Sequence, residues 1–413
     1  MRVLFLLNTF APGYMSGAEI SAYHTCRGLM RDGVRCSLLV VSGRGAAQAL
    51  DECYEYDGIP IHRVNVHPPR HGPWRDVFDG RVYRAVLAEL RRTQPDLAHI
   101  HNVAGATLAP FVACRTARVP VVNTLHDLWL LCANNMRYRY DGSFCDPTRY
   151  PERCRQCFRR YDYWADVPFR RTLFSALTSN VRFFISPSQA LIDLHARAGY
   201  DARRFRLIAN GFEPSGLDAP RHARVRAVVG TAHAYQTVTF AGGGLEVKGA
   251  GVLVQAIPLM ARHIERLRVV VAGGGEERFL ALFRQSAPLV QTLGIVPFAE
   301  MRALFAASDL TVAPSTWYEN APVTICESLQ VGTSVVASAI GGIPEMIRER
   351  ETGYLFRAGD APALAAQVIS HFARPTPERR RMRWRCIADA QDKWSLDRHV
   401  DSVLRLYTTV LNS

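Results

Sequence analysis

The chain has 413 residues, of which 48% are hydrophobic and 21% are charged. This composition excludes a chain without a packed core, and the length predicts two domains rather than one. The formal net charge of +13 comes almost wholly from arginine. It favours anionic partners such as nucleotide diphosphates, acidic lipid surfaces or nucleic acid, without choosing among them.

The first residues, Met1–Leu7, form an apolar run that is too short for a signal peptide. No run in the sequence reaches the length of a membrane span. We therefore expect a cytoplasmic protein, with the inner face of the membrane as a second location. A reducing compartment would keep most of the ten cysteines as thiols.

The first half of the chain alternates short apolar segments with helices. This alternation predicts βαβ units and a parallel sheet, whose ligands bind at the carboxyl ends of the strands. The expected strands are Arg2–Leu7, Cys36–Ser42, Ile59–Val66, Leu97–Ile100 and Val119–Thr124, and the expected helices begin at Gly17 and at about Arg81.

Two of the loops at strand ends carry candidate binding residues. Gly17 opens a helix, and a glycine there lets a phosphate approach the backbone closely. His126 follows the strand that ends at Thr124. His99 and His101 share one face of their strand, and we interpret His99 as a structural residue.

Residues Leu128 to about Ser175 do not follow the αβ pattern. Four cysteines lie here or at its start, Cys132, Cys145, Cys154 and Cys157, and the Cys154-x2-Cys157 spacing suits tetrahedral zinc. We expect a structural zinc site, with unligated thiols and disulfides as alternatives. Nine arginines in the segment would face an anionic acceptor or a membrane, or simply form a solvated basic loop.

The second domain begins after the turn at Asn210-Gly211. A strand at Thr237–Phe240 leads to the triplet Gly242–Gly244 and then to Lys248. We expect the glycine amides to form an anion nest and Lys248 to supply a point charge. Further along the chain, one expected helix contains five arginines: Arg379, Arg380, Arg381, Arg383 and Arg385. A solvated face is the first interpretation of that helix, and membrane attachment is the second.

A strand–loop–helix unit around Glu319 organises this second domain. Ser308–Ser315 predicts a buried strand, and Val323–Gln330 predicts a short helix preceded by Pro322. The free amides and positive end of such a helix suit a diphosphate. Glu327 lies one turn into the helix, within reach of a ribose diol, and Glu319 can accept hydrogen bonds from a sugar. The alternative is that both glutamates are solvated charges.

The run E-N-A-P-V-T-I-C-E-S-L-Q-V-G-T-S-V-V-A-S-A-I-G-G-I-P-E-M-I from Glu319, followed by E-T-G-Y-L-F, resembles family 4 of the retaining glycosyltransferases. Glu319 and Glu327 match the E-x7-E motif of that family. The resemblance covers nearly the whole chain apart from Leu128–Ser175. It implies the α/β GT-B fold, in which two Rossmann-like domains face each other across a cleft. The implied domains are residues 1–210 with a cysteine-containing insertion at about 128–175, residues 211–391, and a C-terminal helix, 392–413, that packs back on the first domain.

The resemblance also implies a role for each matching residue. Glu327 would bind the ribose and Glu319 the donor sugar, while Gly17 and Lys248 would lie beside the diphosphate. His126 would position the donor and stabilise negative charge. Main-chain amides at Asn320, Ala321, Val323 and Thr324 would contact the sugar and phosphate. Two positions depart from the family: Ser16 stands where a second glycine is usual, and Gly243 where an arginine is usual.

We therefore expect a retaining glycosyltransferase that moves a sugar from a nucleotide-diphosphate sugar to a sugar or lipid-linked acceptor, in polysaccharide or glycoconjugate biosynthesis. The sequence has no D-x-D motif, so no catalytic metal or other catalytic cofactor is expected. Peripheral membrane contact is a further possibility, and nucleic acid is not an expected partner. The alternatives are a nucleotide-sugar epimerase of the same fold and a non-catalytic basic protein that binds nucleic acid or membranes.

Overall fold

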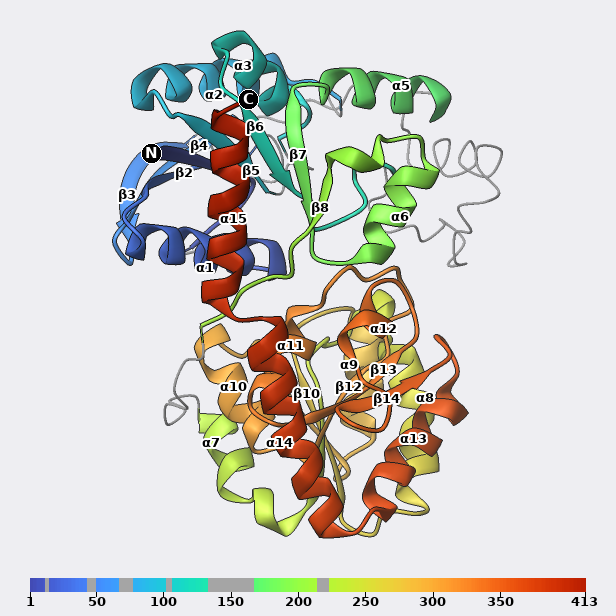
Figure 1. Cartoon of the computed structure of the whole chain (residues 1–413). Coiled ribbons are helices and arrows are strands. Elements are labelled where there is room, and N and C mark those ends of the chain that lie inside the picture. The colour runs from blue at the N-terminus through green and yellow to red at the C-terminus, as the bar shows by residue number, and fades with distance from the viewer. Residues whose placement is uncertain (12–14, 43–49, 67–76, 102–105, 133–166, 214–222) are drawn as a thin grey trace. The chain divides into compact units, whose positions relative to one another are not determined.

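The computed structural model describes residues 1–11, 15–42, 50–66, 77–101, 106–132, 167–213 and 223–413. The chain forms two compact units, which are described separately below. The first contains Met1–Glu213 together with Leu396–Ser413, and the second contains Pro214–Ser395. The chain therefore returns to the first unit for its last helix (Figure 1).

The first unit is built on a sheet whose described strands run in the order β3-β4-β2-β1-β5-β6-β7-β8. All neighbours pair in parallel except β3, which pairs antiparallel with β4 at the edge. Because the chain moves outward from β1 and then returns beside it as β5, the strand order reverses between these two strands. The strands are β1 (Arg2–Leu7), β2 (Arg35–Ser42), β3 (Leu50–Tyr56), β4 (Ile59–Asn65), β5 (Leu97–Ile100), β6 (Val121–Thr124), β7 (Val181–Ser186) and β8 (Phe205–Leu207).

The last helix, α15 (Leu396–Leu411), is part of the core of the first unit. Its buried side chains Val400 and Tyr407 belong to the same hydrophobic cluster as Phe5 of β1. Contact with α1 is close, because a Cβ on Gly28 would lie 2.4 Å from Val400. The other described helices of this unit are α1 (Gly17–Arg31), α2 (Gly80–Thr93), α3 (Ala109–Ala117), α5 (Val167–Leu177), α6 (Gln189–Arg197) and η2 (Ala202–Arg204).

The second unit has a fully parallel sheet in the order β11-β10-β9-β12-β13-β14. Its strand order reverses between β9 and β12, which pair directly. The strands are short and buried on both faces, as expected for a parallel sheet covered by helices. They are β9 (Gln236–Phe240), β10 (Leu267–Ala272), β11 (Val290–Gly294), β12 (Leu310–Ala313), β13 (Ser334–Ser338) and β14 (Gly353–Phe356).

Helices cover the second sheet and complete its core. For example, α8 and α13 contribute Leu253 and Leu364 to the same apolar cluster as Val269 of β10. The helices are α7 (Ala223–Gly230), η3 (Ala232–Ala234), η4 (Glu246–Lys248), α8 (Ala250–Ala261), α9 (Glu277–Gln285), α10 (Phe298–Ala306), α11 (Val323–Gln330), α12 (Ile343–Met346), α13 (Ala361–Ala373) and α14 (Thr376–Lys393).

The predicted strands are confirmed within a few residues, but the expectation of parallel strands alone is wrong for the first unit. Strand β3 was not predicted, and it forms a hairpin with β4. The two strands are joined by Asp57 and Gly58, whose φ angles of 51° and 78° suit a tight hairpin turn. An Asp-Gly pair between two strands is a hairpin signal, so the sequence did contain the information.

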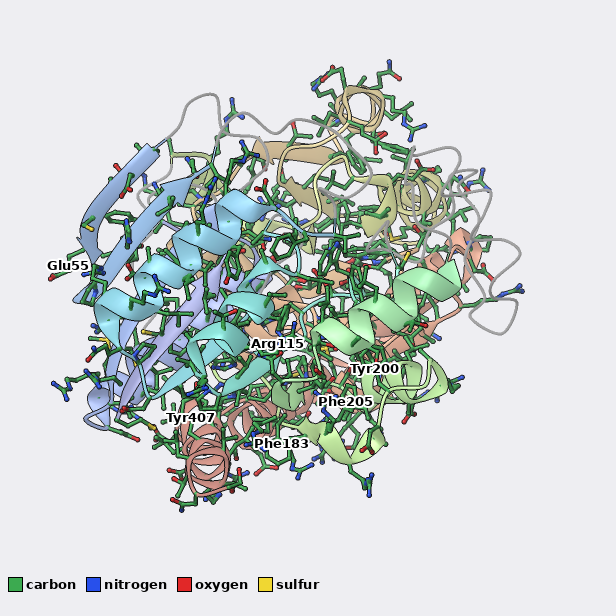
Figure 2. The ribbon with its side chains drawn as sticks, turned by 90° about the horizontal axis from the view of Figure 1, so that it is seen from above. Glu55, Arg115, Phe183, Tyr200, Phe205 and Tyr407 are labelled. Carbon is green, nitrogen blue, oxygen red and sulfur yellow. The ribbon has the colours of Figure 1, made fainter. Side chains whose placement is uncertain are left out.

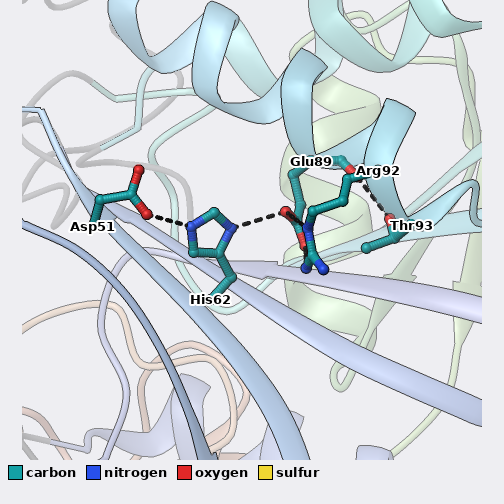
Figure 3. A network of polar contacts seen from close by, with 5 residues as sticks. All are labelled: Asp51, His62, Glu89, Arg92 and Thr93. Atoms are coloured by element: carbon teal, nitrogen blue, oxygen red, sulfur yellow. Dashed lines mark hydrogen bonds and ion pairs between the residues drawn. The ribbon is translucent and has the colours of Figure 1, made fainter.

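Three charged groups connect this hairpin to α2 (Figure 3). His62 of β4 bonds to Asp51 of β3 through Nε2, at 2.7 Å, and to Glu89 of α2 through Nδ1, at 2.8 Å. Glu89 is buried and also accepts a hydrogen bond from Arg92 at 2.6 Å. Burial by itself would lower the pKa of His62, but the hydrogen bonds to the two carboxylates raise it above its ordinary value.

This network makes a pH-dependent contribution to stability. Because the pKa of His62 is raised in the folded state, its contribution is complete below the ordinary histidine pKa and is lost as pH rises through the raised value. We expect His62→Phe to destabilise the protein by about 1 kcal/mol more at pH 6 than at pH 9. Urea unfolding at both pH values measures this difference. Equal losses at both pH values for His62→Phe would contradict the expectation.

None of the seven described cysteines forms a disulfide. In the described part of the chain, no helix is both long enough and apolar enough to cross a membrane.

Candidate functional site

The candidate site in the second unit lies where the strand order reverses, a common ligand position in open α/β sheets. The adjacent strands β9 and β12 lead into the loops that carry Lys248 and Glu319. A hydrogen bond of 2.9 Å from the Thr316 amide to the Val247 carbonyl joins the two loops. Gly249 permits this approach, because a Cβ there would lie 1.9 Å from the Pro314 oxygen.

Lys248 and Glu319 form an ion pair at the centre of the site. The Lys248 Nζ lies 2.7 Å from Glu319 Oε1, and the Ser315 hydroxyl donates to the same oxygen at 2.8 Å. The ammonium also lies 4.8 Å from the centre of the Trp317 ring, at cation–π distance. The Lys248 side chain keeps 32% of its surface exposed, whereas that of Glu319 keeps 7%. The lysine is therefore fixed in position yet remains accessible to an anion.

The turn after β13 also holds the backbone of Glu319 in place. Gly342 donates its amide to the Glu319 carbonyl at 2.9 Å. Gly341 has a φ of 61°, and a Cβ at this position would lie 2.0 Å from the same carbonyl oxygen. A glycine is required here, so the Gly341-Gly342 turn positions Glu319 and contributes no side chain.

Helix α11 begins directly after this loop. Pro322 is its N-cap residue, with extended backbone angles, and Val323 and Thr324 are its first two residues. The N–H groups of the first residues of a helix have no intrahelical acceptor. Among the described residues, no hydrogen bond is found for the Ala321, Val323 or Thr324 amides, so all three can donate to an anion or a sugar. Asn320 lies in the same loop and has polar contacts of its own.

Glu327 lies on α11, one turn beyond these amides. Only 5% of its surface is exposed, and its Oε1 atom has no hydrogen-bond partner among the described residues. Burial raises the pKa of this carboxyl to about 8, and the positive charge of Arg302 opposes the shift only in part. A buried acceptor without a donor is costly in a folded protein. Glu327 is therefore suited to accept hydrogen bonds from a ligand, and a pair of vicinal hydroxyls has the required donors.

The prediction that the glycine triplet forms an anion nest is wrong for Gly243 and Gly244. The Gly243 amide donates to the Ala272 carbonyl at 2.9 Å, and the Gly244 amide donates to the Gly274 carbonyl at 3.0 Å. A Cβ at Gly243 would lie 1.9 Å from the Gly274 oxygen, so the two glycine-rich loops pack backbone against backbone. Gly243 thus has a packing role, and it does not replace the positive charge of the arginine that is usual in the family.

In the first unit, Gly17 is the first residue of α1, as predicted. Ser16, which takes the place of a glycine, is the N-cap of this helix. Glu19 accepts hydrogen bonds at this helix end from the Ser16 amide, at 2.9 Å, and from the Thr9 hydroxyl, at 3.0 Å. The serine is therefore compatible with the helix start, and a buried carboxylate already occupies part of its positive end.

His126 follows β6 and is bonded to a second histidine. Its Nε2 atom lies 2.8 Å from Nδ1 of His101, with the two rings stacked at 5.1 Å. Burial is the largest cause that lowers the pKa of His126, to about 3, and His399 adds to it. Burial likewise holds the pKa of His101 well below its ordinary value. Both rings are neutral at physiological pH, so a single proton lies between them.

The neighbouring His99 has a structural role, as interpreted from the sequence. Its Nδ1 lies 2.5 Å from the Tyr407 hydroxyl of α15, and its Nε2 lies 2.7 Å from the Thr124 hydroxyl. Tyr407 is labelled in Figure 2, where the C-terminal helix is seen end on. Both nitrogens of His99 are satisfied, so this ring connects β5 to α15 and β6 and is not available to a ligand.

The hydrogen bond between His101 and His126 predicts which nitrogen of His126 carries the proton. His101 Nε2 is buried without a partner among the described residues. A buried N–H without an acceptor is rarer than an acceptor without a donor. We therefore expect His101 to donate through Nδ1, which leaves His126 protonated on Nδ1. Nitrogen-15 NMR of labelled histidine assigns the tautomer directly. His101→Phe, which retains a ring, should release His126 into a mixture of tautomers, and finding the Nε2–H form of His126 in the wild type would contradict the expectation.

The predicted zinc site lies largely outside the described residues. Cys145, Cys154 and Cys157 all fall there, and only Cys132 is described. Within the described residues, no group of three or more histidine, cysteine, aspartate or glutamate side chains could hold a metal ion. The zinc assignment thus remains a prediction.

The sequence analysis did not identify four residues that lie at these sites. Ser315 and Trp317 contact the ion pair, Arg302 is the charge that acts on Glu327, and Glu19 occupies the start of α1. Ser315 and Trp317 follow a strand whose carboxyl end was already expected to lie at the site, so their position was a usable signal. Arg302 comes from α10, and no local pattern connects it to Glu327.

Comparison with known proteins places the chain in a family. The sequence profile described as "Glycosyltransferase Family 4" matches residues 15–215, and that of "Glycosyl transferases group 1" matches residues 235–373. The chain belongs to glycosyltransferase family 4. It is 28% identical to the phosphatidyl-myo-inositol mannosyltransferase of Mycobacterium leprae over 220 residues, which are 51% of this chain and 58% of that protein. It is 26% identical to D-inositol 3-phosphate glycosyltransferase 1 of Catenulispora acidiphila over 376 residues, which are 86% of this chain and 82% of that protein.

Solved structures that are similar to this family 4 protein confirm the predicted GT-B fold. Anabaena HepE in complex with UDP-glucose superposes with a TM-score of 0.73 at 20% identity, covering 99% of this chain and 100% of that chain. Sucrose-phosphate synthase of Thermosynechococcus elongatus superposes with a TM-score of 0.76 at 18% identity, covering all of both chains.

Proposed function

We propose that this protein transfers a sugar from a nucleotide-diphosphate sugar to a sugar or lipid-linked acceptor. The observation that carries the proposal is the unpartnered, buried Oε1 of Glu327, on the same short helix whose free N-terminal amides follow the Lys248–Glu319 pair. A ligand that combines a diol, a diphosphate and a sugar matches this order of groups. Separate solvated glutamates, the alternative considered from the sequence, would be exposed, and both are buried.

The relatives support this class of donor. The Anabaena HepE structures contain UDP or UDP-glucose. Two of the similar proteins are named as transferring mannose to phosphatidylinositol or a sugar to inositol phosphate, which supports glycoconjugate biosynthesis as the setting. The seven described thiols, all unpaired, suit a cytoplasmic location.

In this proposal each group of the second unit has one task. Glu327 accepts hydrogen bonds from the ribose hydroxyls, and Glu319 accepts one from the donor sugar. The amides of Val323 and Thr324, together with Lys248, face the diphosphate. As the bond between the anomeric carbon and the diphosphate oxygen breaks, negative charge grows on that oxygen, and these donors stabilise it. We propose retention of configuration by front-face substitution, in which the acceptor hydroxyl gives its proton to the leaving diphosphate.

We also propose that transfer proceeds without a divalent metal. The sequence has no D-x-D motif, and Lys248 with the end of α11 offers positive charge at the position where a metal would act. Activity retained in excess EDTA, at a level equal to that with added magnesium, is the expected result.

The function is tested by a thermal-shift screen of nucleotide sugars, followed by product analysis of the best ligand with and without simple glycoside acceptors. We expect one nucleotide class to stabilise the protein and sugar transfer to require an acceptor. Release of free nucleotide with an epimerised sugar, in the absence of acceptor, would instead identify an epimerase. Absence of stabilisation by every nucleotide sugar would contradict the proposal.

A further inference from the structure

Helix α14 presents one face whose composition differs from the rest of the second unit. It has buried residues along one side, namely Met382, Cys386, Asp389 and Ala390. The opposite side is exposed at Arg380, Arg381, Trp384, Arg385 and Ala388. These positions are spaced one, four, five and eight residues along the helix and therefore share one face. Figure 1 shows the helix lying along the outside of its unit.

Trp384 is the residue on this face that most needs an explanation. It is 73% exposed, whereas Trp394 just after the same helix is 4% exposed. Trp384 makes no ring contact with another described residue, so packing within the chain does not account for a tryptophan here. A single exposed aromatic is ordinary on a protein surface. Its immediate charged neighbours distinguish this one.

The arginines of α14 fall into two groups. Arg379 and Arg383 face the body of the unit, where Arg379 lies 3.9 Å from Asp309 and Arg383 donates to the Val331 carbonyl. The other three, Arg380, Arg381 and Arg385, surround Trp384, and no carboxylate among the described residues pairs with any of them. The acidic Asp389 is buried on the opposite side and pairs with Arg348 and Lys393. The exposed face therefore carries three positive charges around one indole ring, and the exposed Asp392 lies one turn beyond Ala388 on the same side.

We propose that this face of α14 binds the surface of an anionic lipid bilayer. A tryptophan ring is most stable at the headgroup level of a membrane, where its apolar body and its N–H group both find suitable surroundings. Arginines beside it gain from the negative surface potential of acidic lipids, which acts within a Debye length. Single-stranded nucleic acid is the weaker alternative, because such sites combine several aromatic rings with a groove that follows the backbone. The α14 face is an outer helix surface with one ring.

The proposal goes beyond the transfer reaction and does not depend on it. A protein held at a bilayer by α14 would meet lipid-linked acceptors in two dimensions instead of three. Membrane binding by this face also explains why the positive charge of α14 is concentrated beside an exposed aromatic residue. A solvated basic face, the first interpretation from the sequence, gives no reason for the tryptophan.

The experiment uses the full chain with sedimenting vesicles of phosphatidylcholine alone and of phosphatidylcholine with phosphatidylglycerol. We expect binding to the anionic vesicles only, weakening as salt is raised. Trp384→Ala should reduce partitioning at least tenfold, and replacing Arg380, Arg381 and Arg385 by alanine should reduce it about a hundredfold. The matched control replaces three exposed arginines elsewhere in the chain, which removes the same net charge: Arg115 of α3, Arg197 of α6 and Arg262 at the C-cap of α8. Arg115 is labelled in Figure 2.

Two further results separate a specific face from general basicity. Quenching of Trp384 by lipids brominated on the acyl chains, judged against Trp384→Phe, shows whether this ring enters the bilayer. Donor stabilisation in the thermal-shift screen should be unchanged in all α14 variants, because the face contains no donor-site residue. Equal loss of vesicle binding in the control triple variant, or unchanged binding in Trp384→Ala, would overturn the proposal. Tighter binding to single-stranded RNA than to anionic vesicles would also overturn it.

Discussion

Lys248→Ala is expected to slow sugar transfer by about 10²–10³-fold while changing donor affinity much less. The lysine already lies at its working position, held by Glu319 at 2.7 Å and by the Trp317 ring. It therefore needs no rearrangement to act. Its charge matters most when the diphosphate departs, since the negative charge on the bridging oxygen grows at that point. Steady-state kcat and KM with saturating acceptor measure the two effects separately.

Controls are needed because the substitution leaves Glu319 buried without its counter-ion. An unpaired buried carboxylate destabilises a protein, so a loss of activity could reflect partial unfolding. Lys248→Arg retains a positive charge and should recover part of the rate, although the guanidinium differs in shape from an ammonium. The double variant Lys248→Met with Glu319→Gln removes both charges and should remain folded but slow. An unchanged kcat in Lys248→Ala would remove Lys248 from the proposed mechanism.

Glu327→Gln is expected to weaken binding of the donor by about 10–100-fold, because an ionised acceptor forms the stronger hydrogen bonds with two hydroxyl groups. In the free protein, burial raises the pKa of Glu327 to about 8. Below that pH the proton competes with the ribose, so wild-type affinity should rise between pH 6 and pH 8.5 and then level off. Calorimetric titration with a nucleotide sugar is suitable, since its diphosphate diester does not titrate in this range.

The same raised pKa sets the sign of a stability effect. The folded protein holds a proton on Glu327 between the ordinary carboxyl pKa and about pH 8, whereas the unfolded chain does not. Wild-type stability without ligand should therefore decrease across this interval relative to Glu327→Gln, which carries no titrating group. Thermal unfolding of both proteins at several pH values gives the comparison. Affinity and stability differences that are both independent of pH would show that Glu327 does not titrate as described.

Much of the fold was predictable because its strands are short apolar runs that alternate with helices. Arg2–Leu7 and Val323–Gln330 have the predicted bounds. The edge of the sheet in the first unit was harder to predict. Its strand β3 has the sequence L-D-E-C-Y-E-Y, which is polar and mostly exposed. An edge strand with few apolar residues gives little hydrophobic signal. In that case only the Asp57-Gly58 turn indicated a hairpin.

The candidate site, like the fold, could be predicted only in part. Spacing along one loop and helix, together with the resemblance to family 4, predicted Glu319, Glu327 and the amides between them as a unit. It could not show that the Gly243 amide is used by the Ala272 carbonyl, since that bond joins loops almost thirty residues apart in the chain. Nor could it show that His101 bonds to His126, because strand register brings these two side chains together. Contacts between separate βα loops are set by tertiary packing and have no signal in a local motif.

We propose that the donor nucleotide binds at the β9 and β12 loops and the start of α11. Hydrogen–deuterium exchange, with and without the nucleotide selected by thermal shift, tests it most directly. We expect slower exchange at the Val323 and Thr324 amides and in residues 315–321, with no change in α14. Protection that appears elsewhere in the chain while these amides exchange at their free rate would contradict it.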